Sequence, residues 1–129
     1  MVKINSIAII EDDETVLHYL AEQIQLCIDV AELRVFGNAE TALKELIAEP
    51  VDIALFDVNL PGMNGIDCIR KLKMVHPKTQ CMVLTVYDKP DIIFEALKAG
   101  AISYLLKSTP AEKIIEAIAE VNKGGSPIS

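Results

Sequence analysis

Acidic residues stand at two points where an apolar run of the sequence ends. The segment Glu11-Asp12-Asp13 follows the run 6–10, and Asp57 follows the run 53–56. Carboxylates that meet in one place repel one another and have raised pKa values unless a cation lies among them. Oxygen ligands of this kind suit Mg²⁺, which takes one or two carboxylates together with water and phosphate oxygens. We therefore predict a Mg²⁺ site formed by Asp12, Asp57 and, through water, Glu11.

A hydroxyl and an ammonium group occupy the matching places after two later apolar runs. Thr85 follows the run 82–84, and Lys107 closes the segment that contains the run 102–105. A site that only held a metal would have no use for them, but they suit a tetrahedral anion bound beside the metal. Asp57 can then attack a phosphoryl group and form an acyl phosphate, while Mg²⁺ and Lys107 neutralise the transferring oxygens.

These residues can meet only if the runs before them lie side by side. Continuous apolar runs alternate with segments of helical periodicity, several of which end at Pro or Gly. The predicted strands are 6–10, 33–36, 53–56, 82–84 and 102–105, and the predicted helices are 15–27, 39–48, 66–75, 91–99 and 110–122.

Five strand-then-helix units with short connections predict an α/β fold. Each crossover must be right-handed and must cover the sheet, so the units form a single doubly wound five-stranded parallel sheet flanked by five helices, of the flavodoxin-like type. Ligands of such sheets bind beyond the carboxyl ends of the strands. The acids, Thr85 and Lys107 all fall at that edge.

Size and composition limit the other functions. The chain has 129 residues, 51% hydrophobic and 24% charged, enough for one domain with its own core. The net charge is −7 and no long basic run occurs, so we expect no direct binding to nucleic acid. No apolar stretch approaches the roughly 20 residues of a membrane helix.

The cysteines indicate a reducing compartment. Cys27, Cys68 and Cys81 are odd in number, form no CxxC pair and lie in apolar stretches, which predicts small hydrophobic core residues and a cytoplasmic protein. His18 and His76 have no partnered acid or metal-ligand spacing, so we assign them no catalytic role.

Over nearly its whole length, the chain resembles the receiver domains of two-component response regulators. The resemblance is carried by an acidic pocket, a phosphoacceptor loop and two switch segments. These are Ile9-Ile-Glu-Asp-Asp13, Asp57-Val-Asn-Leu-Pro-Gly-Met-Asn-Gly65, Leu84-Thr85 and Ala99-Gly-Ala-Ile-Ser-Tyr-Leu-Leu-Lys107.

The resemblance implies a role for each matching residue. Asp57 would be the phosphoacceptor, and Thr85 and Tyr104 the switch residues. The metal ligands would be Glu11, Asp12, Asp57 and the backbone carbonyl of Asn59, and the phosphoryl oxygens would be bound by Thr85 and Lys107. The domain would be a signalling module, not a metabolic enzyme, that catalyses its own phosphorylation and dephosphorylation. Its partners would be a sensor histidine kinase or phosphotransfer protein, and the resemblance also allows a homodimer on phosphorylation.

The segment 104–110 and the ending 124–129 most resemble receivers that precede a LuxR-type helix-turn-helix. We therefore predict a receiver domain over residues 1–123 and the start of a C-terminal linker over 124–129. The output domain, absent from this chain, would regulate transcription by binding DNA.

Two residues depart from the family pattern. Ser108 follows Lys107 where the family often has Pro, and Val86 follows Thr85 where the family usually has a small residue. We hypothesise that Val86, with Tyr87 and Asn59 at the rim, restricts the attacking water and lengthens the life of the acyl phosphate.

Three alternatives remain at this point. The acids after the first run could simply cap the next helix, and this applies most to Asp13. The fold could hold FMN, although three acids stand where a phosphate-binding loop would be needed. The chain could also be a pseudo-receiver that docks partners without accepting phosphate.

Overall fold

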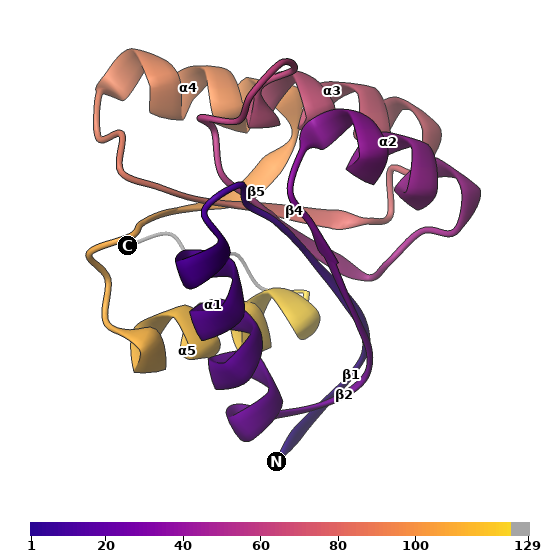
Figure 1. Ribbon diagram of the computed structural model, residues 1–129, viewed down its shortest axis with the longest axis vertical. Helices are drawn as coiled ribbons and strands as arrows, with labels where there is room; N and C mark the ends of the chain where they lie inside the picture. Colours follow the sequence, from indigo (N-terminus) through magenta and orange to yellow (C-terminus); the bar gives the residue numbers. More distant parts are fainter. Residues whose placement is uncertain (125–129) are drawn as a thin grey trace.

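The computed structural model describes residues 1–124, in which five strands alternate with five helices (Figure 1). The predicted linker, apart from Gly124, lies outside this range. The strands are β1 (Val2–Ile10), β2 (Ile28–Phe36), β3 (Ile53–Phe56), β4 (Gln80–Thr85) and β5 (Ala101–Leu106), and the helices are α1 (Glu14–Cys27), α2 (Ala39–Ala48), α3 (Gly65–Val75), α4 (Pro90–Ala99) and α5 (Ala111–Asn122).

The strands form one parallel sheet in the order β2-β1-β3-β4-β5. Helices α2, α3 and α4 cover one face, and α1 and α5 cover the other (Figure 1). This confirms the predicted doubly wound fold. The winding direction reverses between β1 and β3, and the loops after these two strands diverge to opposite faces, which opens a crevice at their carboxyl ends.

The central strand β3 is buried on both faces. Ala54 and Phe56 pack under α2, α3 and α4, whereas Ile53 and Leu55 pack under α1 and α5. All four side chains are at most 2% exposed. A strand held on both faces has little freedom to shift, so the residue that follows it, Asp57, has a well-defined position.

Strands β1 and β2 are longer than their apolar runs predicted. Val2 lies opposite Ile28, and the two strands stay paired up to Ile10 and Phe36. The first half of β1 includes exposed polar residues such as Lys3 and Asn5, which hide the strand from a search for continuous apolar runs. These residues belong to the strand because their backbone pairs with β2. Buried and exposed side chains alternate along this part of β1, so it is not continuously apolar.

Two of the three cysteines are core residues as predicted, but Cys27 is exposed. Burial raises the pKa of the Cys68 and Cys81 thiols to about 12. Cys27 is the last residue of α1, and the chain turns there directly into β2, where Ile28 takes the buried place. The helical periodicity of α1 therefore predicts the burial of its side chains correctly only up to the residue before Cys27.

Within residues 1–124, none of the helices combines the length and the apolar character needed to cross a membrane.

Candidate functional site

The predicted acidic residues converge at the carboxyl ends of β1 and β3. Carboxylate oxygens of Glu11, Asp12 and Asp57 all lie within 4.8 Å of one another. The strand pairing causes this, because Ile10 lies opposite Phe56 and the Asp57 amide donates to the Ile10 carbonyl at 3.0 Å. Glu11 and Asp57 are buried, and Asp12 is exposed, so the cluster opens to solvent through Asp12.

Lys107 provides the positive charge of the cluster. Its Nζ forms an ion pair with Glu11 and a second one with Asp57, at 2.9 Å from Oδ2. Its amide donates to the Thr85 carbonyl at 2.8 Å, which fixes the start of the loop after β5. The Lys107 side chain therefore reaches from the end of β5 to the two buried carboxylates.

The pKa values show how burial and pairing compete here. Burial raises the pKa of Glu11, and the hydrogen bonds from Lys107 and from the Asp13 amide offset this only in part. Burial lowers the pKa of Lys107, but its hydrogen bonds to Glu11 and Asp57 and their charges raise it by more. Lys107 is therefore an ammonium at neutral pH, paired with carboxylates that outnumber it.

The donor set fits Mg²⁺. Three carboxylates face one ammonium, all the donor atoms of the cluster are oxygens, and one carboxylate is open to solvent for an ion that keeps part of its water. Residues 1–124 place no His or Cys in this cluster. Zinc and other softer ions are therefore poorly matched.

Asp13 caps α1. Its Oδ1 accepts from the Thr15 amide at 2.9 Å and from the Val16 amide at 3.3 Å, while its own amide donates to Glu11 at 3.3 Å. It is not part of the metal cluster. The capping alternative is thus correct for Asp13 and does not apply to Glu11, which is buried and paired with Lys107.

The loop after Asp57 folds back tightly on the strand. The Asn59 amide donates to Asp57 Oδ1 at 3.2 Å, and the Gly65 amide donates to the Val58 carbonyl at 3.0 Å. Gly65 lies so close to the Asp57 carbonyl that a Cβ would overlap it. This loop carries Asn59, whose carbonyl the resemblance assigns to the metal.

The two predicted switch residues differ in hydrogen bonding. Thr85 is completely buried, and its Oγ1 has no hydrogen-bond partner among the described residues. Tyr104 is partly buried against the core under α2, α3 and α4, and its hydroxyl donates to the Tyr87 carbonyl at 2.7 Å. A buried hydroxyl without a partner costs free energy, so Thr85 is ready to bond an oxygen brought by a ligand.

The two departures from the family pattern lie at the surface of this edge. Val86 directly follows Thr85 and is 67% exposed, so it lies at the surface and not in the core. The peptide bond after Lys107 is trans, as are all those of residues 1–124.

Glu40 contacts this region although the sequence did not single it out. It lies on α2, and its Oε2 accepts from the Met63 amide, in the loop after Asp57, at 2.9 Å. The partner is a backbone amide of a distant segment, so no pattern of residue types signals the contact.

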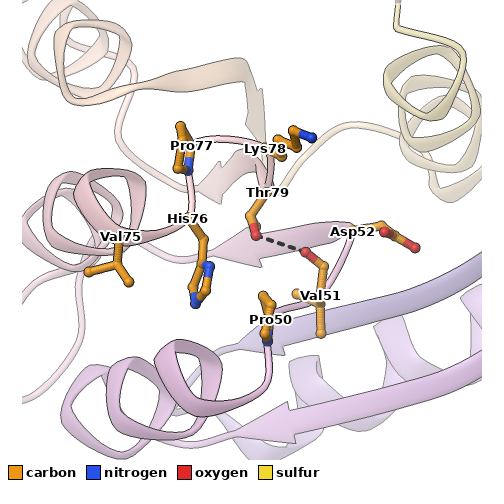
Figure 2. Close-up of a pocket in the computed structure, with 8 residues that line it drawn as sticks. All are labelled: Pro50, Val51, Asp52, Val75, His76, Pro77, Lys78 and Thr79. Carbon is orange, nitrogen blue, oxygen red and sulfur yellow. Dashed lines mark hydrogen bonds between the residues drawn. The ribbon is translucent and has the colours of Figure 1, made fainter.

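A separate pocket of about 330 Å³ lies at the opposite edge of the sheet, before β3 and β4 (Figure 2). Its polar groups are used by the fold: the Thr79 hydroxyl donates to the Val51 carbonyl at 2.8 Å, and His76 Nε2 lies 2.7 Å from the Ile47 carbonyl. His76 is the C-cap of α3.

The fold and the acidic edge agree with comparisons to known proteins. The family model described as "Response regulator receiver domain" matches residues 7–119. The chain therefore belongs to the receiver domains of two-component response regulators. Magnesium binding is general in this family, and Glu11, Asp12 and Asp57 form the matching acidic cluster.

Curated relatives include transcriptional regulators. The chain is 38% identical over 91 residues to the transcriptional regulatory protein DegU of Brevibacillus brevis, an alignment covering 70% of this chain and 39% of that protein. It is 30% identical over 119 residues to the transcriptional regulatory protein LnrK of Bacillus subtilis, covering 92% and 54%. The chain thus spans only about two fifths to just over half of the length of these relatives.

Solved structures share the fold. A CheY-like response regulator receiver domain protein from Methanospirillum hungatei superposes with a TM-score of 0.87 at 25% identity, covering 94% of this chain and 95% of that one. A LuxR-family two-component response regulator from Aurantimonas gives 0.89 at 23% identity, covering 96% and 91%.

Replacing Lys107 by Met should destabilise the metal-free protein by about 2 kcal/mol near neutral pH, because two buried carboxylates lose their counter-ion. The pKa of Glu11 should rise further once the lowering hydrogen bond is gone. A carboxyl whose folded-state pKa exceeds its unfolded value adds stability at low pH that is lost as the pH rises through the folded-state pKa. The destabilisation should therefore be smaller at about pH 5 than at about pH 7.5.

Urea unfolding without divalent cations, at both pH values, measures this. Lys98→Met is the matched control, since Lys98 pairs with Glu95 at 3.6 Å and both side chains are over half exposed. We expect it to change stability by less than about 0.5 kcal/mol. An equal loss at both pH values for Lys107→Met would contradict the assigned charge balance.

Proposed function

We propose that Asp57 is the phosphoacceptor of this receiver domain and that its phosphorylation requires Mg²⁺. The observation that carries the proposal is the meeting of three carboxylates with Lys107 at one edge of the sheet. This arrangement supplies a nucleophile, oxygen ligands for a hard cation and a cation for the phosphoryl oxygens.

Each residue then has a defined task. A carboxylate oxygen of Asp57 attacks phosphorus, the new O–P bond forms, and the bond from phosphorus to a phosphohistidine nitrogen of the donor breaks. Lys107 and Thr85 bind the phosphoryl oxygens. Glu11, Asp12, Asp57 and the Asn59 carbonyl would hold Mg²⁺, which supplies charge neutralisation at the phosphoryl oxygens. The same site hydrolyses the acyl phosphate when water replaces the donor.

The donor is a sensor histidine kinase or a phosphotransfer protein, as for other receivers. The relatives named above are transcriptional regulators, and the aligned region makes up only 39% and 54% of their length. The output that we propose is therefore DNA binding by a LuxR-type helix-turn-helix domain in the full-length protein. The chain itself carries a net charge of −7, which disfavours direct contact with nucleic acid.

Phosphorylation changes the surface formed by α4 and β5. Thr85 bonds the new oxygens, Tyr104 leaves the Tyr87 carbonyl and turns inward, and the loop between β4 and α4 follows. Phe94 and Leu97 on α4 are 60% and 46% exposed, a degree of exposure that suits a surface waiting for a partner. We propose that one such partner is a second copy of the chain, so that the phosphorylated protein forms a homodimer.

Replacing Asp57 by Asn should abolish phosphorylation, because the amide is no nucleophile. The protein is incubated with acetyl phosphate and Mg²⁺, and intact mass spectrometry counts added phosphoryl groups. The parent should gain one group, and chelation of Mg²⁺ should prevent it. Asp29→Asn, an exposed change on β2, is the control and should behave as the parent. A parent that never gains mass would indicate a pseudo-receiver instead.

Replacing Thr85 by Ala should leave phosphorylation possible but uncouple it from the switch, because no hydroxyl remains to follow the phosphoryl oxygens. Beryllofluoride with Mg²⁺ should shift the NMR signals of Tyr104 and α4 in the parent and in Thr85→Ser, but much less in Thr85→Ala. Parent-like shifts at Tyr104 in Thr85→Ala would refute the coupling.

Replacing Val86 by Ala should speed hydrolysis of the acyl phosphate several-fold, because the exposed valine no longer shields Asp57 at the rim. Phosphorylated protein is freed of donor, and loss of the phosphoryl mass is followed with time. Val35→Ala serves as control, since Val35 is 47% exposed on the distant edge strand β2. Equal rates in the parent and Val86→Ala would rule out the shielding.

A further inference from the structure

The loop between Asp57 and α3 is held at both ends and, between them, by the buried side chain of Leu60 and by Met63, which packs against the core. At its start the Asn59 amide bonds Asp57, and at its end Asn64 accepts from the Asp67 amide at 2.9 Å and caps α3. Pro61 and Gly62 between these ends are exposed. This exposed stretch has no buried side chain of its own, so a further contact from outside the loop restricts its conformation.

Glu40 on α2 supplies that contact. Its Oε2 accepts from the Met63 amide at 2.9 Å, across 23 residues of sequence. Hydrogen bonds from this amide and from its own backbone amide lower the pKa of the Glu40 carboxyl, so it is ionised at neutral pH. Glu40 also lies in the first turn of α2, where the free amides of the helix favour a negative charge.

The backbone of Gly62 lies next to the Glu40 carboxylate. Its φ is +73°, a conformation that residues with a side chain adopt at a cost. The place that a Cβ would take at Gly62 is already filled by the Glu40 carboxylate. The carboxylate thus lies directly against the loop backbone at Gly62, where the absence of a side chain leaves room for it.

The hydrogen bond acts on the part of the loop that the metal needs. Met63 stands two residues before Gly65, whose Cα rests on the Asp57 carbonyl and whose amide bonds the Val58 carbonyl. Asn59 lies between Asp57 and Met63, whose amides both donate hydrogen bonds. Holding Met63 against α2 therefore limits the orientations open to the Asn59 carbonyl.

We propose that Glu40 is a positioning residue of the phosphorylation site: through the Met63 amide it holds the loop that presents the Asn59 carbonyl to Mg²⁺. This inference rests on the proposed function of Asp57. Glu40 touches neither the metal cluster nor the phosphoryl site, so its loss changes the affinity for Mg²⁺ and leaves the chemistry at Asp57 intact. Residues that orient metal ligands from outside have this effect.

Three variants of α2 test the proposal. Glu40→Ala removes the acceptor, Glu40→Gln removes the charge but keeps a side-chain oxygen, and Glu45→Ala removes an exposed charge elsewhere on the helix. Mg²⁺ affinity is measured by calorimetry, and hydrogen exchange of the Met63 amide is measured in the metal-free protein. We expect Glu40→Ala to bind Mg²⁺ about 10-fold more weakly, the lower end of the effect of residues that orient metal ligands, and to exchange Met63 faster, while Glu40→Gln and Glu45→Ala stay close to the parent.

Phosphorylation provides the second readout. With acetyl phosphate, Glu40→Ala should need more Mg²⁺ for half-maximal rate but reach the parent's rate at saturating Mg²⁺. Gly62→Ala should weaken Mg²⁺ binding at least as much as Glu40→Ala, because its Cβ displaces the Glu40 carboxylate and also strains the backbone at φ +73°. Adding Glu40→Ala to Gly62→Ala should weaken binding little further, because the hydrogen bond is already lost.

The possible failures are distinguishable. If Glu40→Ala exchanges Met63 faster yet binds Mg²⁺ like the parent, the positioning role is wrong. If Glu40→Gln weakens Mg²⁺ binding as much as Glu40→Ala, the effect is one of charge, and the proposal is likewise overturned. If the parent neither binds Mg²⁺ nor accepts a phosphoryl group, the proposed function of Asp57 itself falls.

Discussion

The buried carboxylates of Glu11 and Asp57 and their pairing with Lys107 constrain the rest of this molecule. Register between β1 and β3 brings the two acids together, and burial makes their repulsion costly. The ammonium from the end of β5 offsets that cost in the metal-free protein. The two buried acids are thus balanced only because β1, β3 and β5 end at the same edge of the sheet. Together these ends carry oxygen ligands that suit a divalent cation and an ammonium group that suits an anion.

The three consecutive acids Glu11, Asp12 and Asp13 have different roles because the backbone turns at this point and directs their side chains differently. Glu11 is still held by the strand, since its amide donates to the Phe36 carbonyl at 3.0 Å, and it is buried beside Lys107. Asp12 turns to solvent, and Asp13 caps α1. Only the first two approach Asp57 closely enough to share a cation with it.

The sequence predicts best where burial leaves no choice. Strand 53–56 and helix 39–48 were predicted to the residue, because a strand buried on both faces is continuously apolar and a helix between a cap and a Pro has clear ends. The acids, Thr85 and Lys107 could be predicted as a site from their places after strands. The polar start of β1 and the contact of Glu40 with the Met63 amide could not, because each depends on a partner segment remote in sequence. The exposure of Cys27 could not either, because α1 ends there and Ile28 takes the buried place.

The hydroxyls of Thr85 and Tyr104 indicate how a small chemical change can move a surface. Tyr104 bonds the Tyr87 carbonyl, whereas Thr85 Oγ1 has no partner among the described residues. A buried unsatisfied hydroxyl costs about 1–3 kcal/mol, and about 1.4 kcal/mol changes an equilibrium tenfold. Relief of that cost by a phosphoryl oxygen is therefore large enough to shift the population of the loop after β4, provided that the oxygen is within reach only when the loop moves. In the proposed switch, the unmade hydrogen bond of Thr85 therefore supplies the driving force, one residue before the loop that responds.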